Sequence, residues 1–294
     1  MKRTGFFGIV GRPNVGKSTL LNSILGQKIA IVSDKPQTTR NRIAGIETRG
    51  EDQFVFLDTP GMFSAKNSLG DFMVKTANST MQEADAVILV ADAGFPPEDV
   101  EKKVIQHLKQ SGTPGILALN KVDLYRGEVV GNTILAYAAL HDFCAVVPIS
   151  AKKGKQVDDL LDECAKLLHE GEWFYGEDDV TDQPMRLVAA EIIREKILRT
   201  LDKEVPHGVA VVIEEYKVDE GMVSIRAEIF CEKDSHKGIL VGKGGETLKR
   251  IGAYAREDLE KMLECKVFLD LWVKVKANWR DDRRWISNFG FNDD

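Results

Sequence analysis

A glycine-rich run near the start of the chain has the residue types and spacing of a phosphate-binding loop. The pattern G-x-x-x-x-G-K-S/T is met by residues 11–18 (GRPNVGKS), which follow an apolar stretch and precede a helical pattern. Glycines let backbone N–H groups turn toward phosphate oxygens, a lysine ammonium reaches the outer phosphates, and the next hydroxyl suits Mg²⁺. We expect nucleotide binding by Gly11, Asn14, Val15, Gly16, Lys17, Ser18 and Thr19.

A second motif indicates which base the nucleotide carries. Residues 120–123 (NKVD) stand at the end of an apolar strand, where doubly wound sheets bind ligands. The Asp123 carboxylate can accept from both the N1–H and the exocyclic N2–H₂ of guanine, and adenine has no such pair of donors. Asn120 can donate to N7, and the stem of Lys121 can cover the ring. A backbone N–H suited to the guanine O6 is expected after the next strand, within Ser150, Ala151 and Lys152.

Two further loops carry the oxygen atoms that a magnesium ion prefers. Asp58 and Gly61 belong to a D-T-P-G run that ends the second apolar strand. We expect the Asp58 carboxylate in the Mg²⁺ shell, through water, and the Gly61 N–H at the γ-phosphate. In a polar loop, residues 36–40 (PQTTR), one threonine would bind Mg²⁺ with GTP and release it after hydrolysis. The sequence favours Thr39 but leaves Thr38 open, so the expected metal ligands are Ser18, Thr39 and Asp58.

These motifs resemble the translation-factor-related class of GTPases, whose five motifs occur in this order within about 140 residues. The runs GRPNVGKSTL and QTTR are similar to the Era and MnmE branch of that class. The resemblance implies GTP hydrolysis that involves Lys17, Asn14, Thr39 and Gly61. Met62 stands where Ras-like GTPases carry a water-orienting glutamine, so hydrolysis should be slow. An asparagine at the Asn14 position helps hold a potassium ion in this branch, in place of an arginine finger.

The elements that must position these motifs follow from apolar periodicity. Near-continuous apolar runs predict buried strands at 6–10, 52–58, 86–91, 115–120 and 144–149, alternating with helices such as 17–25 and 100–110. This alternation predicts an α/β fold, a P-loop NTPase with a mostly parallel, doubly wound sheet. We expect this GTPase domain at 1–172 and an acidic, glycine-flanked linker at 173–184, with its three consecutive aromatic residues packed against a neighbouring domain.

The remainder, 185–294, is predicted to be a small α+β domain with a basic tail. Its expected order is a helix at 185–201, strands at 208–216 and 222–230, a short helix ending at 241, a helix at 246–264 and a strand at 266–276. The glycine loop 242–245 (GKGG) falls between the last two helices. A G-x-x-G run is common by chance, but the α-β-β-α-α-β order around it resembles a type II KH domain, which clamps a nucleic-acid backbone.

Positive charge gathers around this glycine loop. Residues 233–250 and 274–284 each carry a local excess of three positive charges, although the whole chain has a net charge of −6. We expect RNA contacts from Lys237, Gly242, Lys243, Gly244, Gly245, Lys249 and Arg250. Apolar side chains expected to line a groove for bases are Ile239, Leu240, Val241, Leu248 and Ile251.

The chain as a whole resembles the Era family, in which a GTPase domain precedes one KH domain. The resemblance implies binding near the 3′ end of 16S ribosomal RNA, action in 30S subunit assembly, and a monomer loosely associated with the inner membrane face. No apolar run reaches the roughly 18 residues that a membrane span needs, so we expect a cytoplasmic protein. The alternatives are an ATP-using P-loop enzyme, which residues 120–123 disfavour, and an interaction module that binds nucleotide without turnover.

Overall fold

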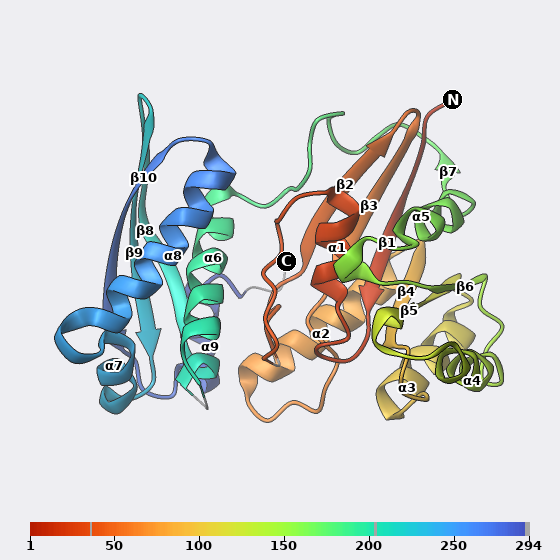
Figure 1. Cartoon of the computed structure of the whole chain (residues 1–294), viewed down its shortest axis with the longest axis horizontal. Coiled ribbons are helices and arrows are strands. Elements are labelled where there is room, and N and C mark those ends of the chain that lie inside the picture. The colour runs from red at the N-terminus through yellow and green to blue at the C-terminus, as the bar shows by residue number, and fades with distance from the viewer. Residues whose placement is uncertain (36, 203–204, 292–294) are drawn as a thin grey trace. The chain divides into compact units, whose positions relative to one another are not determined.

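The computed structural model describes residues 1–35, 37–202 and 205–291, so Pro36 of the polar loop lies outside the described part. The chain divides into two compact units, and Figure 1 labels their elements. The first unit comprises Met1–Ala30, Thr39–Ser64 and Met73–Asp182. The second comprises Ile31–Thr38, Ala65–Phe72 and Gln183–Asp294. Two short segments from the N-terminal part of the chain therefore belong to the second unit.

The first unit is built on a seven-stranded, mostly parallel sheet. Its strands are β1 (Arg3–Val10), β2 (Ile43–Arg49), β3 (Asp52–Asp58), β4 (Ala86–Asp92), β5 (Gly115–Asn120), β6 (Ala145–Pro148) and β7 (His169–Glu170). The order is β2-β3-β1-β4-β5-β6, with β7 paired to the start of β1. Strand β2 runs antiparallel to β3, and the five strands from β3 to β6 in this order are parallel. Every residue of β4 is buried, as expected for a strand covered on both faces.

Helices cover the two faces of this sheet. Helices α1 (Lys17–Leu25) and α5 (Val157–Ala165) pack in one apolar core. Helices α2 (Ser68–Glu83), α3 (Asp99–Ser111) and α4 (Gly127–Ala138) contribute to a second core. Because β1, β3, β5 and β6 are parallel, the loops that follow them open at the same edge of the sheet. These are the loops that carry the predicted nucleotide motifs.

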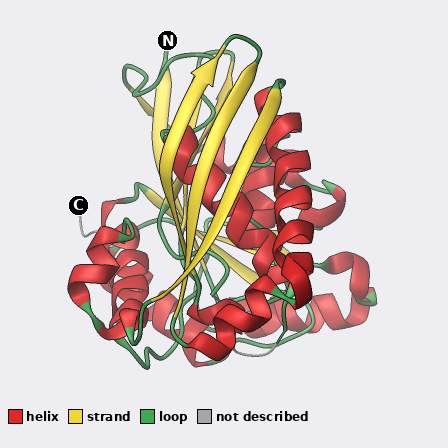
Figure 2. Ribbon diagram, turned by 90° about the vertical axis from the view of Figure 1, so that its left-hand side faces the viewer, coloured by secondary structure: helices red, strands yellow, loops and turns green. Residues whose placement is uncertain are grey.

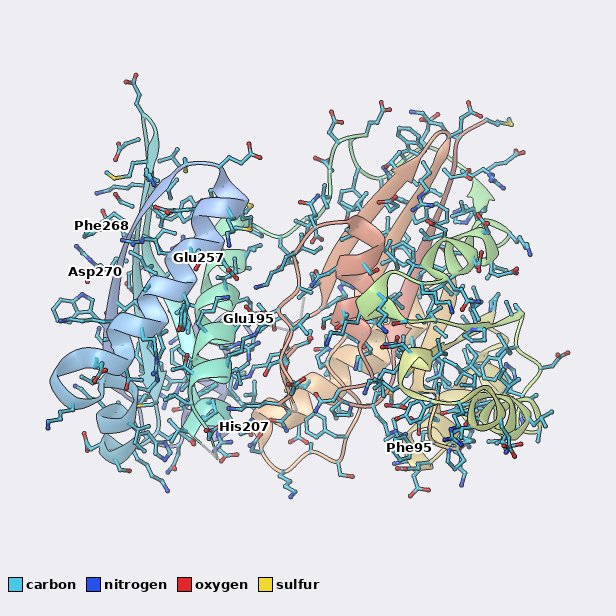
Figure 3. The ribbon with its side chains drawn as sticks, viewed as in Figure 1. Phe95, Glu195, His207, Glu257, Phe268 and Asp270 are labelled. Carbon is cyan, nitrogen blue, oxygen red and sulfur yellow. The ribbon has the colours of Figure 1, made fainter. Side chains whose placement is uncertain are left out.

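The second unit contains a three-stranded sheet with helices on one face. The element order is α6 (Met185–Thr200), β8 (Ala210–Asp219), β9 (Met222–Cys231), α7 (Asp234–Val241), α8 (Glu246–Leu263), β10 (Lys266–Val275) and α9 (Arg283–Asn288). Strand β9 lies in the middle, antiparallel to β8 and parallel to β10. Apolar residues of α6 and α8 form a core with the sheet. Figure 2 looks onto this unit, and Phe268, which is 60% exposed, lies on β10 on the side away from α6 and α8 (Figure 3).

The predicted α/β fold with a following α-β-β-α-α-β domain is confirmed, and the strand predictions in the first unit match to within a few residues. The end of the chain differs from the predicted basic tail. Trp279 is fully buried, its Nε1 donates to Gly208 O at 3.0 Å, and its ring lies 5.2 Å from that of Phe289. Apolar side chains at 279, 286 and 289 thus fold this segment back onto its own unit. The excess of positive charge along residues 274–284 does not prevent this packing, because the buried side chains are apolar.

The aromatic run at 173–175, which the sequence placed in a linker against a neighbouring domain, belongs to the first unit itself. The Phe174 ring lies 4.8 Å from the Phe6 ring, and Tyr175 packs against the small core cluster of Ala44, Val55 and Leu57. The Gln53 side chain donates to Tyr175 O at 3.0 Å and accepts from the Phe174 N–H at 3.0 Å. The neighbour that these rings contact is the first unit's own sheet.

Candidate functional site

The phosphate-binding run forms a tight loop between β1 and α1. Gly11 and Gly16 have positive φ angles of 148° and 101°, and a Cβ at Gly16 would lie 2.3 Å from Asn120 Nδ2. Only glycine fits there. Lys17 begins α1, and its Nζ donates to the backbone oxygens of Gly11 at 3.2 Å and Arg12 at 3.0 Å. The loop therefore brings an ammonium group and a helix N-terminus to one point, the arrangement that binds phosphate.

Three oxygen-bearing side chains meet beside this loop. Ser18 Oγ donates to Asp58 Oδ2 at 2.6 Å and lies 2.8 Å from Thr39 Oγ1. Asp58 is fully buried, and its Oδ1 has no hydrogen-bond partner among the described residues. The Thr38 hydroxyl instead donates to Lys35 O at 2.6 Å. An unpartnered carboxylate oxygen beside two hydroxyls fits Mg²⁺, which prefers oxygen ligands, and this geometry favours Thr39 over Thr38.

Burial perturbs the two ionisable groups of this site. Burial raises the pKa of Asp58 to about 6, although the charge of Lys17 and the hydrogen bond from Ser18 oppose the shift. Burial also lowers the pKa of Lys17 to about 8, with the Asp58 charge opposing. Both shifts disfavour the charged forms. A metal ion and phosphate groups would supply the opposite charges that these two side chains need.

One amide joins three loops of the predicted base site. Asn120 Nδ2 donates to Val15 O at 2.8 Å, and Asn120 Oδ1 accepts from the N–H groups of Lys121 at 2.8 Å and Ala151 at 2.9 Å. We predicted that Asn120 donates to the base and that a backbone N–H near Ala151 reaches the guanine O6. In the structure both groups also form hydrogen bonds that hold neighbouring loops together, and the sequence did not indicate this role. One amide hydrogen of Asn120 is left for the base.

The Asp123 carboxylate is oriented by the loop that follows β6. Ser150 Oγ donates to Asp123 Oδ1 at 2.7 Å, and this hydrogen bond lowers the pKa of Asp123. Lys153 Nζ lies 3.4 Å from Asp123 Oδ2. The carboxylate is therefore held ionised and in a fixed orientation, as a double acceptor for guanine must be. Sequence reasoning placed Ser150 near the base but missed its hydroxyl and Lys153.

The loop after β3 lies directly against the phosphate-binding loop. A Cβ at Gly61 would lie 2.8 Å from Pro13 Cα, and the Met62 N–H donates to Gly11 O at 3.1 Å. Met62 is 9% exposed and packs in the core shared with α2 and α3. Its side chain offers no polar atom to orient a water molecule, in agreement with the sequence prediction.

A further contact of the phosphate-binding loop was not predicted. Arg12 Nε donates to Glu101 Oε1 at 2.5 Å, and its Nη1 lies 2.6 Å from Glu98 Oε2. Glu101 is fully buried in the first turn of α3, where the two glutamates also form a capping box. A cavity of about 270 Å³ lies beside the loop, and its lining includes Asn14, Phe95 and Lys121. The only sequence signal for this anchor was the spacing of the two glutamates.

In the second unit, residues 242–245 turn the chain from α7 into α8. Gly242, Gly244 and Gly245 have φ angles of 74°, 61° and 83°. A Cβ at Gly244 or Gly245 would meet nothing within 4 Å, so the loop surface is open. Four exposed basic residues surround it, and none forms an ion pair with another described residue: Lys237, Lys243, Lys249 and Arg250. Bare backbone beside unpaired positive charge is what a phosphate clamp of the KH type uses.

Two expectations about the RNA surface are corrected by the structure. Leu240 and Ile251 are fully buried in the core of the second unit, so these two side chains do not line a groove, whereas Ile239 is 49% exposed. The positive excess at 274–284 is partly offset by carboxylates from β9 and the residue after it. Lys274 pairs with Glu228, and Arg280 pairs with Glu232 at 2.6 Å.

The fold and the two sites define a class, a P-loop GTPase domain followed by a KH-type domain. Residues 6–121 match the family described as 50S ribosome-binding GTPase, and residues 204–280 match the KH domain family. The chain belongs to the GTPase Era family. It is 48% identical over 290 residues to GTPase Era of Ruminiclostridium cellulolyticum, covering 98% of this chain and 97% of that protein. GTPase Era of Clostridioides difficile is 48% identical over 296 residues, covering 100% of both.

Two solved structures are similar over nearly the whole chain. A variant of Era from Aquifex aeolicus bound to GDP and aluminium fluoride has a TM-score of 0.95 at 40% identity, covering 98% of this chain and 99% of that one. Era in complex with MgGDPNP and nucleotides 1506–1542 of 16S ribosomal RNA has a TM-score of 0.94 at 39% identity, covering 99% of each chain. In the part of the chain described here, no helix is both long and apolar enough to span a membrane.

Proposed function

We propose that the chain is a GTP-hydrolysing switch that binds 16S ribosomal RNA near its 3′ end through the glycine loop and acts in assembly of the 30S subunit. One observation carries this proposal. The chain combines a buried phosphate site with an open glycine loop flanked by unpaired basic residues. The similar Era structure that contains a 16S RNA fragment supports the choice of RNA.

In this proposal the nucleotide is held at both ends. The phosphates bind the backbone of the loop from Gly11 to Thr19, with Lys17 at the outer phosphates and Gly61 at the γ-phosphate. Guanine binds Asp123 through two hydrogen bonds, with support from Asn120, Lys121, Ser150, Ala151 and Lys152. The hydrogen bond that Ser150 donates to Asp123 at 2.7 Å supports this assignment, because it orients the carboxylate.

The magnesium ion is assigned to Ser18, Thr39 and Asp58. When bound, Mg²⁺ neutralises developing charge on the phosphate oxygens. The residues of the chain do the positioning. Asp58 holds the Ser18 hydroxyl at 2.6 Å, and Thr39 reaches the same oxygen from the polar loop. Loss of the γ-phosphate would release the Thr39 segment, and that release is the switch.

We also propose that potassium supports hydrolysis at Asn14. Met62 provides no polar atom, and Asn14 has a positive φ of 62° and lines the cavity beside the loop. Replacing sodium by potassium should then raise the hydrolysis rate of the chain. Asn14→Ala should abolish that increase while leaving GDP affinity nearly intact. Equal rates in sodium and potassium would contradict this assignment.

The base assignment is tested by Asp123→Asn. Xanthine carries a carbonyl where guanine carries the N2 amino group, and the new amide can donate to that carbonyl. The variant should therefore lose affinity for GTP and bind xanthosine triphosphate better. A variant that keeps the preference for GTP would refute the base site and leave the ATP-using alternative open.

The switch itself is tested by titrating the 3′ end of 16S RNA into the full chain with GDP or with a non-hydrolysable GTP analogue. If RNA binds tighter with the GTP analogue than with GDP, linkage requires RNA to raise the preference of the chain for the analogue over GDP by the same factor. Equal RNA affinity in both states would refute the switch. No RNA binding in either state would favour the interaction-module alternative.

The family resemblance supports two finer proposals. We propose that the chain works as a monomer in the cytoplasm and that part of it associates peripherally with the inner membrane surface. Light scattering of the purified chain should give the mass of one chain, near 32.7 kDa. Flotation with vesicles that contain anionic lipid should recover a salt-sensitive fraction, and no recovery at low salt would refute the membrane proposal.

A further inference from the structure

A buried carboxylate next to the proposed base site is not among the residues proposed to touch the nucleotide. Asp92 is the last residue of β4, and the strand register places it beside Asn120 at the end of β5. Asp92 is 7% exposed, and its Oδ2 lies 2.9 Å from Lys121 Nζ. A buried ion pair rarely adds net stability over apolar residues of similar size. Stability alone therefore does not explain why β4 ends in a carboxylate.

Three groups hold the Asp92 carboxylate in place. The Gly94 N–H donates to Asp92 Oδ1 at 3.0 Å, and the Tyr125 hydroxyl and the Lys121 ammonium also donate to the carboxylate. Burial favours the neutral carboxyl group, but these hydrogen bonds outweigh it and lower the pKa of Asp92. Asp92 is therefore ionised, with one oxygen on the Gly94 backbone and the other toward the lysine.

The Tyr125 ring is itself fixed by its surroundings. A Cβ at Gly94 would lie 2.2 Å from Tyr125 Cζ, so the ring packs directly on the Gly94 backbone. The Phe95 ring stands edge-on to the Tyr125 ring, with the two centroids 6.5 Å apart. Phe95, which is 49% exposed, is labelled in Figure 3. The position of the tyrosine hydroxyl thus depends on a glycine two residues after the carboxylate that it holds.

Lys121 gains from this support because its backbone and its side chain are both costly to order. Its φ of 66° lies in the left-handed region that residues other than glycine rarely adopt. Its N–H donates to Asn120 Oδ1 at 2.8 Å, and its carbonyl accepts from the Leu124 N–H at 2.9 Å. These hydrogen bonds fix the backbone, but a four-carbon stem still has many rotamers. The ion pair with Asp92 restrains the far end of that stem.

A restrained stem matters for a ligand that lies flat against it. Lys121 lines the cavity of about 270 Å³ beside the phosphate-binding loop, together with Asp92 and Phe95. A long side chain that becomes ordered only on binding loses rotamer entropy, which is equivalent to about two- to tenfold in affinity. A stem that Asp92 already holds loses less, because the restraint exists before the nucleotide arrives.

We infer that Asp92 is a positioning residue for guanine-nucleotide binding. It holds the Lys121 ammonium so that the stem of Lys121 is ready to cover the face of the base. Asp92 itself touches no ligand atom, and Gly94 and Tyr125 keep its carboxylate oriented. All of these residues belong to the first unit. The inference rests on the proposed base site, in particular on the proposed packing of the Lys121 stem against the ring.

The test is the calorimetric affinity of the full-length chain for GDP in the presence of Mg²⁺. Asp92→Asn keeps the shape of the side chain and removes the charge that attracts the lysine, so affinity for GDP should fall about fivefold. Affinity for inosine diphosphate, which lacks the N2 amino group, should fall by the same factor, because the stem covers the ring face and not its edge. A loss confined to GDP would mean that Asp92 acts through Asp123, and it would overturn the inference.

A double-mutant cycle with Lys121→Ala isolates the ion pair. Lys121→Ala removes the stem and should lower GDP affinity by more than Asp92→Asn does. In the Lys121→Ala background, Asp92→Asn should cause no further loss, because the stem that it positions is gone. A further loss as large as in the wild-type background would mean that Asp92 supports the loop in a general way, and the inference would be wrong.

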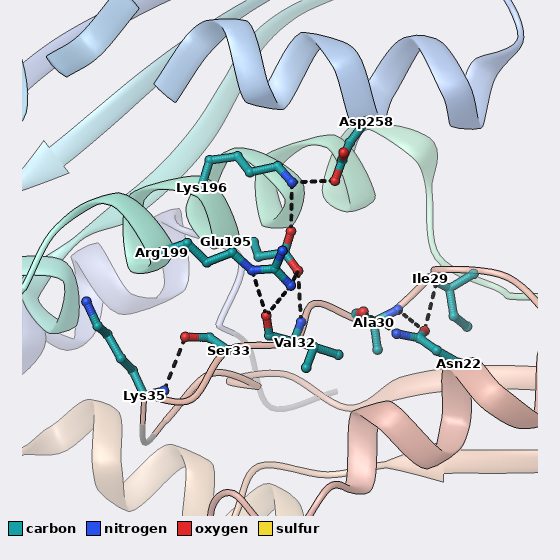
Figure 4. Close-up of polar contacts among 10 residues, drawn as sticks. All are labelled: Asn22, Ile29, Ala30, Val32, Ser33, Lys35, Glu195, Lys196, Arg199 and Asp258. Atoms are coloured by element: carbon teal, nitrogen blue, oxygen red, sulfur yellow. Dashed lines mark hydrogen bonds and ion pairs between the residues drawn. The ribbon is translucent and has the colours of Figure 1, made fainter. Parts of the chain in front are cut away.

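The matched control is an aspartate–lysine pair in the second unit. Asp258 on α8 pairs with Lys196 on α6 (Figure 4). Asp258→Asn makes the same chemical change there and should leave affinity for GDP at the wild-type value. A loss in Asp258→Asn equal to that in Asp92→Asn would show an unspecific effect of breaking such a pair and would also overturn the inference.

A second variant guards against misfolding of Asp92→Asn. Tyr125→Phe keeps the ring on Gly94 and removes only the hydroxyl that donates to Asp92, so GDP affinity should fall about twofold. Thermal unfolding shows whether each variant is folded. Wild-type affinity in folded Asp92→Asn, or in Tyr125→Phe if Asp92→Asn does not fold, would refute the positioning role.

Lys121→Ala also separates this inference from the proposed function. If Lys121→Ala loses GDP affinity and Asp92→Asn does not, the stem covers the base and Asp92 does not position it. If Lys121→Ala binds GDP like the wild type, the proposed packing of the stem on the base fails, and the inference fails with it. The guanine contacts of Asp123 are tested independently by Asp123→Asn.

Discussion

Two glycine loops of this chain lead into a helix, at residues 11–16 before α1 and at 242–245 before α8, and they differ in their surroundings. Gly16 and Gly245 hold the same N-cap position, with φ angles of 101° and 83°. A Cβ at Gly16 would overlap Asn120, whereas a Cβ at Gly245 would meet nothing within 4 Å. Lys17 is buried beside the first loop, while the basic residues around the second are exposed.

The difference follows from the ligand that each loop is proposed to bind. A nucleotide is small enough to be surrounded, so buried groups can meet its phosphates where water is excluded and charge interactions are strong. An RNA strand passes through its site, so the loop must stay open and solvated charges must supply the attraction. Substitutions in the first loop should therefore cause large losses of nucleotide affinity, and substitutions in the second should cause smaller losses of RNA affinity.

The largest effect is expected from Gly16→Ala. The added methyl overlaps Asn120 Nδ2, and the positive φ adds strain of about 1–3 kcal/mol. GTP affinity, measured by calorimetry, should fall by at least about a hundredfold. Gly245→Ala is the matched control, because it has the same backbone conformation without the overlap. It should leave GTP affinity unchanged and lower RNA affinity by less than about fivefold. If both variants lost GTP affinity to a similar extent, the proposed difference between the two loops would be wrong.

The next effect in size is expected from Gly244→Asp. The carboxylate would stand where an RNA phosphate approaches, and like-charge repulsion adds to the strain at a φ of 61°. RNA affinity should fall roughly 10- to 50-fold for every RNA sequence tried. Hydrolysis of GTP without RNA should stay at the wild-type rate, because the first unit has its own core. Gly244→Ala is the control that measures the effect of backbone strain alone. If both variants bind RNA like the wild type, the glycine loop is not the RNA-binding site.

A pH dependence should distinguish the buried site from the exposed one. Asp58, with a pKa of about 6, must lose a proton before it serves Mg²⁺, so affinity for Mg²⁺·GDP should fall by up to about tenfold per pH unit below 6. Asp58→Asn should bind weakly at every pH. Identical pH profiles for wild type and variant would assign the effect to the nucleotide phosphates.

For the nucleotide-free chain the same pKa acts on stability with a definite sign. The folded pKa is raised above the ordinary value of 3.8, so the contribution of Asp58 to stability is fully present below about pH 4. It is lost as the pH rises through about 6. Thermal unfolding followed between pH 4 and pH 7 should show this loss, and Mg²⁺ with nucleotide should reverse it.

The smallest expected effect compares two lysines on the second unit. Lys249 has no ion-pair partner among the described residues, whereas Lys274 pairs with Glu228. Lys249→Ala should lower RNA affinity a few-fold and reduce the slope of log affinity against log salt by about 1. Lys274→Ala should change both quantities less. A larger effect at Lys274 would mean that the unpaired lysines are not the RNA contacts.

Much of the nucleotide site could be predicted because its residues are close neighbours within short motifs. Lys17 and Ser18 follow the loop directly, and Asp58 ends a strand that the apolar pattern locates well. The hydrogen bonds that hold the loops of this site together could not be predicted in the same way. Asn120 to Val15 and Ser150 to Asp123 join residues 105 and 27 positions apart. Only the folded chain brings such residues together.

The errors in the second unit have a similar cause. A helical period shows that residues 239–251 have an apolar side, but it does not tell which of them face the core, and Leu240 and Ile251 do. Counting charge along 274–284 showed an excess, yet the neutralising Glu228 belongs to β9 and Glu232 directly follows it. A count along one segment misses charges that a neighbouring strand supplies.

The contacts of Asn120 limit how this site could be altered by mutation. Its amide binds Val15 of the phosphate-binding loop, the Lys121 backbone and the Ala151 backbone at once. A substitution that adjusted base contacts at this residue would also loosen the loop that holds the phosphates. Within the described residues, the Asp123 carboxylate is held by Ser150 and Lys153 and has no such link to the phosphate-binding loop. A single mutation at Asp123 can therefore change the base preference alone. A single mutation at Asn120 cannot, because it would also loosen the phosphate-binding loop.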